Sequence, residues 1–234
     1  MTTPQDSNEP QAVRERYARR AVQDPRYSLL NPAALLPMQE RQRAMLALFK
    51  RLGWHDLSTR TLHEVGCGSG SNLVELIQLG FDPAHLSGVE LLAERHAQAR
   101  ARLPQGVTLL HGDALVLAPP PASVDVLLQS TVFSSLLNDD FQQRLAASMW
   151  ESVKPGGGVL WYDFTVDNPR NKDVRGVSVR RVRELFPKAR VSAQRITLAP
   201  PIARAAVRVH PALYTLFNTL PLLRTHVLCW LAKP

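Results

Sequence analysis

The chain has 234 residues, of which 45% are hydrophobic, so it can bury one large core or two small ones. Cys67 and Cys229 are too few and too far apart in sequence for a disulfide framework or a metal cluster, and the opening MTTPQDSNEPQ lacks the apolar core of a signal peptide. We therefore expect one domain with an N-terminal extension, in the reducing cytoplasm and without a metal site.

The chain has a formal net charge of +8. Residues 165–210 contain eleven Lys or Arg and three acids, so their net charge alone equals that of the whole chain. Positive potential concentrated in this way would attract an anionic partner, such as a phosphate-bearing substrate, an acidic membrane surface or a nucleic acid. A solvated basic helix face is an equally good interpretation.

Residues 11–51 show helical spacing that Gly53 ends, and from there strands and helices alternate. Strands are predicted at residues 59–65, 86–90, 107–114 and 123–133, then after a KPGGG turn up to residue 164, and finally at 227–232, with helices at 71–80, 91–104 and 141–153. Parallel neighbours need a crossover, so this order predicts a parallel sheet with helices on both faces. Ligands of such sheets bind beyond the carboxyl ends of the strands.

The segment LHEVGCGSGSN, residues 62–72, places three alternating glycines after the first predicted strand. A phosphate-binding P-loop needs Lys and then Ser or Thr after its last glycine, but Gly70 is followed by Ser71 and Asn72. A dinucleotide loop, GxGxxG, has glycine in the sixth place, where this chain has Ser71. Glu64, two residues before the first glycine, would repel a pyrophosphate and suits a ligand with a positive amino group, bound directly or through water.

The pattern hEVGCGSG resembles motif I of class I S-adenosylmethionine-dependent methyltransferases, and the resemblance continues in order over residues 60–165. Glu90 falls where the acid of this family accepts hydrogen bonds from both ribose hydroxyls, and GDA at 112–114 falls at its adenine site. The segments VDVLLQS and VKPGGGVL resemble its fourth-strand motif and the turn before its fifth strand.

This resemblance implies S-adenosylmethionine as the cofactor and an α/β fold of the Rossmann-like kind. The fold is a three-layer sandwich, with a mostly parallel seven-stranded sheet, its last strand antiparallel, and helices on both faces. The residues implied for cofactor binding are Glu64, Gly66, Cys67, Gly68, Gly70, Asn72, Glu90, Leu91, Asp113, Ala114, Gln129 and Ser130.

Some of these residues also have purely structural interpretations. Glu90 could be an acid favoured at a helix N-terminus, Asp113 a turn former, and Cys67 a small residue that fills space. The joint spacing of Glu90 and Asp113 favours ligand binding. The pair Asp139 and Asp140 could suggest magnesium, but we favour an N-cap for the helix that follows.

Methyl transfer is an in-line displacement on a sulfonium, so the protein must align acceptor, methyl group and leaving sulfur. A hydroxyl acceptor would gain about 100-fold or more from a base within hydrogen-bond reach. Asp163, at the carboxyl end of the fifth strand, is the first candidate base, and His226 the second, although His226 is equally well explained as a structural residue. Phe133, Trp161 and Tyr162 could supply apolar walls, and core packing explains the last two equally well.

No Asn/Asp-Pro-Pro-Tyr/Phe signature follows the fourth strand, so a nucleic acid is not the expected acceptor. The tail beyond residue 165, with ERYARR and QERQRAM near the N-terminus, resembles a bacterial subgroup of small methyltransferases associated with envelope polysaccharide or lipid-linked glycan synthesis. This implies a hydroxyl acceptor on an anionic or lipid-linked glycan, with the basic 165–210 region in peripheral contact with the inner face of the membrane. Prolines and charges interrupt the apolar tail, so no transmembrane helix is expected.

Two alternatives stay open. One is a small-molecule O- or C-methyltransferase for a quinone, polyketide or other aromatic acceptor, and the other is a non-catalytic module that binds the cofactor. Residues 1–52 are expected to form an N-terminal helical lid, with Tyr17, Arg19, Arg20 and Tyr27 over the cofactor, and residues 53–234 the cofactor-binding domain.

Overall fold

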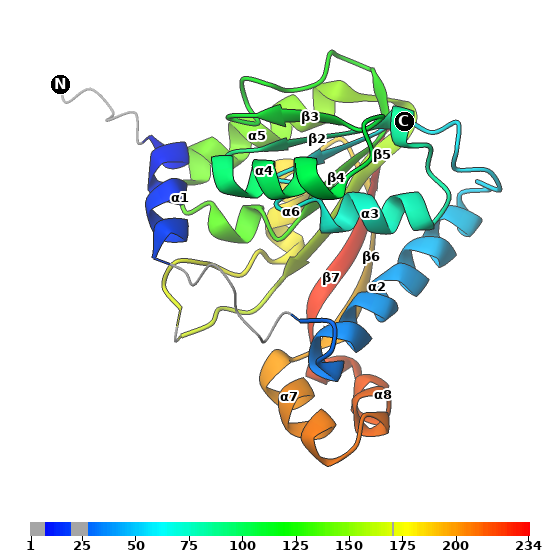
Figure 1. Ribbon diagram of the computed structural model, residues 1–234, viewed down its shortest axis with the longest axis vertical. Helices are drawn as coiled ribbons and strands as arrows, with labels where there is room; N and C mark the ends of the chain where they lie inside the picture. Colours follow the sequence, from blue (N-terminus) through cyan, green and yellow to red (C-terminus); the bar gives the residue numbers. More distant parts are fainter. Residues whose placement is uncertain (1–7, 20–27, 170) are drawn as a thin grey trace.

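The structure, a computed structural model, describes residues 8–19, 28–169 and 171–234 (Figure 1). The lid candidates Arg20 and Tyr27 therefore lie outside the described residues. In chain order the elements are α1 (Glu9–Ala18), α2 (Pro32–Arg51), β1 (Leu62–Val65), α3 (Ser71–Gln78), η2 (Pro83–His85), β2 (Leu86–Glu90), α4 (Ala93–Arg102), β3 (Thr108–His111), β4 (Val124–Ser130), η3 (Phe133–Ser135), α5 (Asp139–Ser152), β5 (Val153–Phe164), α6 (Val179–Leu185), β6 (Arg190–Leu198), α7 (Pro200–Val209), α8 (Ala212–Asn218), η4 (Pro221–Leu223) and β7 (Arg224–Ala232).

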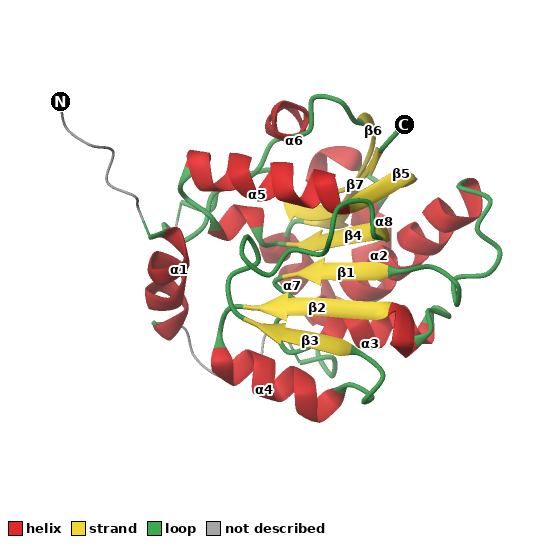
Figure 2. Ribbon diagram, turned by 90° about the horizontal axis from the view of Figure 1, so that it is seen from above, coloured by secondary structure: helices red, strands yellow, loops and turns green. Residues whose placement is uncertain are grey.

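The strands of the described chain form one seven-stranded sheet in the order β3-β2-β1-β4-β5-β7-β6 (Figure 2). β7 runs antiparallel to both of its neighbours, β5 and β6, and the other neighbouring pairs are parallel. The predicted α/β sandwich with an antiparallel last strand is therefore confirmed. β6 was not located from the sequence, because RVSAQRITL lies at the sheet edge with mostly exposed residues in its first half and shows no apolar run there.

Both faces of the sheet are buried, because successive residues of a strand point to opposite faces. Val126 and Leu128 of β4 belong to the core shared with α2, α3 and α4, whereas Leu127 belongs to the core shared with α1, α5 and α6. This explains why the central strands read as continuous apolar runs. Phe49 of α2 is almost fully buried in the first core, so α2 is an integral layer of the sandwich.

The KPGGG segment is part of β5 and not the turn that the sequence suggested. β5 runs from Val153 to Phe164, and Gly158 pairs with β4 on one side and β7 on the other. A Cβ on Gly158 would lie 2.5 Å from the indole ring of Trp230, so glycine makes room for this side chain on the adjacent strand.

The N-cap predicted at the start of α5 lies one residue earlier. Asn138 is the cap, and its side chain accepts the N–H of Phe141. Asp139 and Asp140 occupy the first turn of the helix, where acidic side chains interact favourably with the helix dipole.

Residues 199–223, which include α7 and α8, form a lobe that we call the α7–α8 lobe. β6 is parallel to β1–β5 and ends at Leu198, whereas the antiparallel β7 begins at Arg224. The α7–α8 lobe therefore projects from the carboxyl edge of the sheet, beside the start of α2 (Figure 1). It has a small core of its own around Tyr214, whose hydroxyl donates to Glu40 Oε2 of α2 at 2.8 Å.

Candidate cofactor-binding site

The loop after β1 turns sharply because three of its glycines are left-handed. Gly66, Gly68 and Gly70 have φ values of 64°, 58° and 79°, which residues with a Cβ rarely adopt. α3 begins directly after Gly70, and no side chain caps its first amides. These amides can therefore bind a ligand at the carboxyl edge of the sheet.

Glu90, the last residue of β2, holds the glycine loop in place. Its Oε2 accepts the N–H of Gly68 at 2.8 Å, and its Oε1 accepts the N–H of Leu92 at 2.7 Å. Each carboxylate oxygen has a second lone pair, so Glu90 can still accept hydrogen bonds from two adjacent hydroxyls.

A cleft of about 130 Å³ opens at the carboxyl ends of β1, β2 and β4. α1 and α5 close its outer side with apolar side chains, among them Val13 and Leu145. The cofactor residues predicted from the sequence that line this cleft are Gly66, Glu90, Leu91, Asp113, Ala114 and Ser130.

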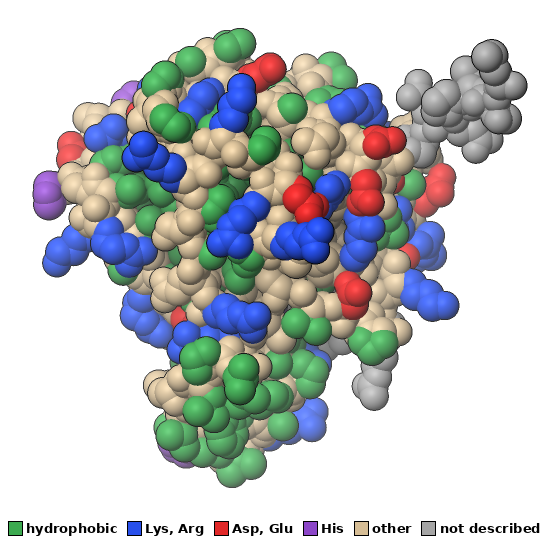
Figure 3. All heavy atoms as spheres, turned by 180° about the vertical axis from the view of Figure 1, so that it is seen from behind, with side chains coloured by type: hydrophobic (Ala, Val, Ile, Leu, Met, Phe, Trp, Pro, Cys, Tyr) green, Lys and Arg blue, Asp and Glu red, His purple; other side chains and the backbone are tan. Residues whose placement is uncertain are grey.

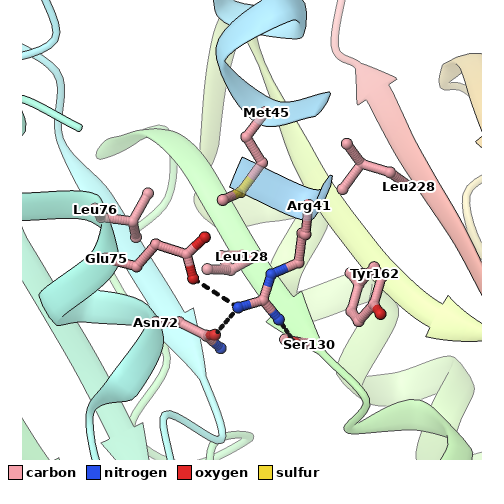
Figure 4. A pocket seen from close by; sticks show the side chains of 9 residues that line it. All are labelled: Arg41, Met45, Asn72, Glu75, Leu76, Leu128, Ser130, Tyr162 and Leu228. Atoms are coloured by element: carbon pink, nitrogen blue, oxygen red, sulfur yellow. Dashed lines mark hydrogen bonds and ion pairs between the residues drawn. The ribbon is translucent and has the colours of Figure 1, made fainter. Parts of the chain in front are cut away.

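Glu64 begins a buried polar network that extends into α2 and α3. Its Oε1 accepts the side-chain amide of Asn72 at 2.5 Å. Arg41 Nη2 then donates to Asn72 Oδ1 at 2.8 Å and to Glu75 Oε2 at 2.6 Å (Figure 4). Ser130 lines the cleft as well as the small pocket around Arg41, so this network adjoins the cleft at the end of β4.

The Glu64 carboxyl does not line the cleft, but one of its oxygens is left for a further hydrogen bond. It is fully buried, its Oε2 has no hydrogen-bond partner among the described residues, and burial raises its pKa to about 8. A cationic ligand group beside Glu64 would favour its ionised form, because a nearby opposite charge lowers the pKa of a buried carboxyl. Sequence reasoning missed Arg41, although it lies one helical turn before Met45 on the predicted apolar face of α2, where a charge is unexpected.

S-adenosylmethionine fits these groups. Glu64 would hold its amino group, Glu90 its ribose, and Asp113 with Ala114 its adenine edge. When bound, the cofactor supplies an electrophilic methyl group on a sulfonium. The protein's contribution is to orient that methyl group and exclude water from the cleft that Ser130 and α1 border.

Other predicted cofactor residues lie behind the cleft walls. Cys67 is buried against Gly88, and burial raises the pKa of its thiol, so it fills space in the turn. Gln129 is fully buried; its Nε2 donates to the carbonyl of Tyr162 at 3.3 Å and its Oε1 accepts the N–H of Val132 at 3.1 Å. Gln129 therefore holds the segment after β4 that lines the cleft.

Neither candidate base lines the cleft; Asp163 is buried and His226 is half-buried. Asp163 is fully buried, its Oδ2 accepts the N–H of Ser134 at 3.1 Å, and burial raises its pKa to about 7. The His226 ring stacks on Tyr162 with ring centroids 5.2 Å apart, and burial together with the charge of Arg41 lowers its pKa to about 4. Ser134 belongs to η3, whose flanking residues line the cleft, so only η3 separates Asp163 from it.

The three aromatic residues predicted as apolar walls of the site lie in different parts of the structure. Phe133 and Trp161 are fully buried and pack on each other with ring centroids 4.6 Å apart, so they belong to the core. Tyr162 lines the small pocket around Arg41 instead.

α1 covers the cleft and is attached to the segment that follows β4. Arg16 donates to Glu9 Oε1 at 2.5 Å and to the carbonyl of Ser135 at 2.9 Å. The Tyr17 ring lies under the guanidinium of Arg95, 4.6 Å from its centroid, and both residues line the cleft. The helix is therefore placed where a lid would be.

Among the described residues 8–19, 28–169 and 171–234, no group of three or more His, Cys, Asp or Glu side chains could hold a metal ion. Asp139 instead pairs with Arg175 and Arg181. No helix in this part of the chain is long and apolar enough to cross a bilayer.

Comparison with known proteins agrees with this geometry. Residues 63–157 match a family described as methyltransferase domain. The trans-aconitate 2-methyltransferase of Afipia carboxidovorans is 30% identical over 159 residues, which are 68% of this chain and 56% of that protein. The chain spans less than two thirds of the length of the curated relatives it matches.

Solved structures share the fold. An S-adenosylmethionine-dependent methyltransferase from Mesorhizobium loti superposes with a TM-score of 0.57 at 17% identity, over 82% of this chain and 95% of that one. A phosphoethanolamine N-methyltransferase 2 from Haemonchus contortus, in complex with S-adenosylmethionine, superposes with a TM-score of 0.61 at 15% identity, over 95% of this chain and 60% of that one. Residues 63–157 thus match a methyltransferase domain, and the fold around them is the one found in structures of S-adenosylmethionine-dependent methyltransferases.

Proposed function

We propose that this protein transfers a methyl group from S-adenosylmethionine to a hydroxyl oxygen of an anionic, lipid-linked acceptor of the glycan type. The proposal rests on one observation, which is that the cofactor cleft and the α7–α8 lobe lie at the same edge of the sheet. The cofactor cleft opens at the carboxyl ends of the parallel strands, and the α7–α8 lobe projects from the same edge (Figure 1). If this edge of the protein lies on a membrane, a lipid-linked acceptor can reach the cofactor while its lipid stays in the bilayer.

The positive charge offered to such an acceptor comes mainly from the second half of the basic region. Arg175 and Arg181 pair with Asp139, and Arg180 pairs with Glu184. After Glu184 the sequence contains no acidic residue. We therefore narrow the proposed contact with the inner, cytoplasmic face of the membrane. It is no longer the whole of residues 165–210 but residues 185–234, which contain no Asp or Glu.

A hydroxyl acceptor requires a base, and we propose Asp163. Its pKa of about 7 suits proton transfer at neutral pH, since a base works best when its pKa lies near the working pH. Ser134 donates to the carboxylate, so a displacement of η3 on acceptor binding would open it to the cleft. His226 is the weaker proposal, because a pKa of about 4 makes it a poor proton acceptor.

A small carboxylic acid is a second candidate acceptor, favoured because neither Asp163 nor His226 lines the cleft. A carboxylate already carries its negative charge, so its methylation needs no base. The name of the trans-aconitate relative points to the same chemistry. In this case Arg41, in the pocket that adjoins the cleft at Ser130, would be the cation that pairs with the acceptor.

The two candidates are separated by a transfer assay with labelled S-adenosylmethionine. The purified protein is offered a membrane glycolipid extract, a pool of small aromatic compounds and a panel of tricarboxylic acids, with the Glu90→Ala variant as the inactive control. We expect label in the glycolipid fraction. Label confined to the carboxylic acids would replace the first candidate by the second, and label confined to the aromatic pool would overturn both.

A further inference from the structure

We propose that the α7–α8 lobe is a docking surface for a lipid bilayer that contains anionic lipids. This inference rests on the proposed function, because docking would serve to bring the cleft to an acceptor that is held in the membrane. The docking itself can be measured without any methyl transfer, so the two can fail separately.

The outer side of the lobe exposes large apolar side chains. Val209 is 79% exposed, Leu216 59%, Leu220 53% and Leu222 91%. Seen from behind, hydrophobic side chains gather over this lobe, and Lys and Arg side chains surround the region where it joins the body (Figure 3). Such a cluster on one projecting element indicates a contact surface, because single exposed apolar residues are ordinary but a contiguous group is not.

The exposed residues are held on a folded support. Ala203 and Tyr214 are buried in the lobe's own core, and Leu36 of α2 packs against this core from the body. Glu40 of α2 accepts hydrogen bonds from the Tyr214 hydroxyl and from the N–H of Thr197. The apolar side chains are therefore presented by a lobe that is packed and hydrogen-bonded against α2.

The positive charge around these apolar side chains favours an anionic partner. Residues 185–234 contain seven Lys or Arg and no Asp or Glu. Arg204 and Arg208 lie on α7 itself, and Arg195 and Arg224 lie where the lobe meets the sheet. Apolar side chains inserted between acyl chains, with arginines at the level of anionic headgroups, are the ordinary composition of a peripheral membrane contact. A second copy of the chain would bring the same positive charges face to face, which opposes pairing through this lobe.

The direction of docking follows from the topology. The lobe is inserted between the end of β6 and the start of β7, so it lies at the same edge as the cofactor cleft. A bilayer that receives Leu216 and Leu222 would face this edge of the sheet. An acceptor could then enter from the membrane surface.

Vesicle flotation with the full chain tests the docking. The wild-type protein is mixed with vesicles of phosphatidylcholine alone or of phosphatidylcholine with phosphatidylglycerol. The apolar variant is Val209→Ser with Leu222→Ser, and its matched control is Val116→Ser, because Val116 is 78% exposed but follows β3, which lies at the other end of the strand order from β6 and the lobe. The charge variant is Arg208→Gln, with Arg51→Gln at the far end of α2 as its control.

We expect binding to the mixed vesicles, a loss of about tenfold or more in the apolar variant, and a loss of about fivefold in Arg208→Gln. Both controls should bind like the wild type. Equal binding of the apolar variant and its control would overturn the proposal. So would a wild-type dimer in sedimentation velocity that the apolar variant dissociates, because the lobe would then be an interface between copies. Calorimetry with S-adenosylmethionine checks that each variant keeps its fold and its cofactor site.

Discussion

Replacement of Glu64 by Gln should abolish a proton release that accompanies S-adenosylmethionine binding. In the free protein, burial raises the pKa of Glu64 to about 8, so the carboxyl is largely protonated at neutral pH. A cationic amino group beside it would favour the ionised form. Binding at pH 7 would therefore expel the proton.

The pKa of about 8 sets the size of the effect. At pH 7 such a group is about 90% protonated, so binding should release about 0.9 proton from Glu64. The sign follows from linkage: a ligand that needs the carboxylate binds more tightly as pH rises. Affinity should increase by close to tenfold from pH 6 to pH 7, and it should fall again above about pH 8, where the α-amino group of the cofactor loses its own proton.

Titration calorimetry in two buffers of different ionisation enthalpy at pH 7 counts the protons. The control is Asp163→Asn, because the pKa of Asp163 is also raised, to about 7, but its side chain lies behind η3. Glu64→Gln should bind the cofactor more weakly and without proton release, whereas the control should release as many protons as the wild type. An unchanged release in Glu64→Gln would refute the assignment of Glu64 to the amino group.

Three further changes test the site and its support. Glu90→Ala should weaken cofactor binding about 100-fold by calorimetry, because charge-assisted bonds to two hydroxyls are lost, while Glu94→Ala on the exposed side of α4 should bind normally; similar affinities would remove the ribose assignment. Deletion of residues 1–19 should raise the dissociation constant several-fold, since α1 forms the outer wall of the cleft, and an unchanged constant would show that α1 is no lid. Gly158→Ala should lower the free energy of unfolding in urea by about 1–3 kcal/mol, because its Cβ would lie 2.5 Å from Trp230, and an unshifted midpoint would contradict this close packing.

The sequence predicted the parts of the fold that depend on local pattern. The strands from β1 to β5 stand out because each is buried on both faces or bounded by glycine and proline. β6 lacks this signal, since the first half of the strand is exposed at the sheet edge and only Ile196 to Leu198 are buried. The sequence does not distinguish the exposed side of α7 and α8 within the apolar tail, because exposed leucines look the same in sequence as buried ones.

The candidate site likewise contains some residues that could be predicted from the sequence and others that could not. The glycine loop, Glu90 and Asp113 could be predicted because their positions follow from the ends of neighbouring strands. The contacts of Arg41 with Asn72 and Glu75 join α2 to α3 across the core, and no local pattern encodes such a pairing. Strand alternation likewise could not reveal that η3 covers Asp163.

The acceptor's chemistry can be tested through Asp163. If the acceptor is a hydroxyl, Asp163 must be ionised to take its proton, so kcat/KM should rise with pH and level off above the Asp163 pKa of about 7. Asp163→Asn should then lower kcat by about 100-fold or more and abolish this pH dependence, while the affinity for S-adenosylmethionine stays the same.

A carboxylate acceptor predicts a different result with the same variant. It needs no base, so kcat would fall by less than about tenfold, and the pH dependence of Asp163→Asn would match that of the wild type. Thermal unfolding of the variant guards against a trivial loss of structure, because the amide can keep accepting the N–H of Ser134 through its oxygen. Only a loss of both rate and pH dependence, in a folded variant that binds the cofactor normally, would support a hydroxyl acceptor with Asp163 as its base.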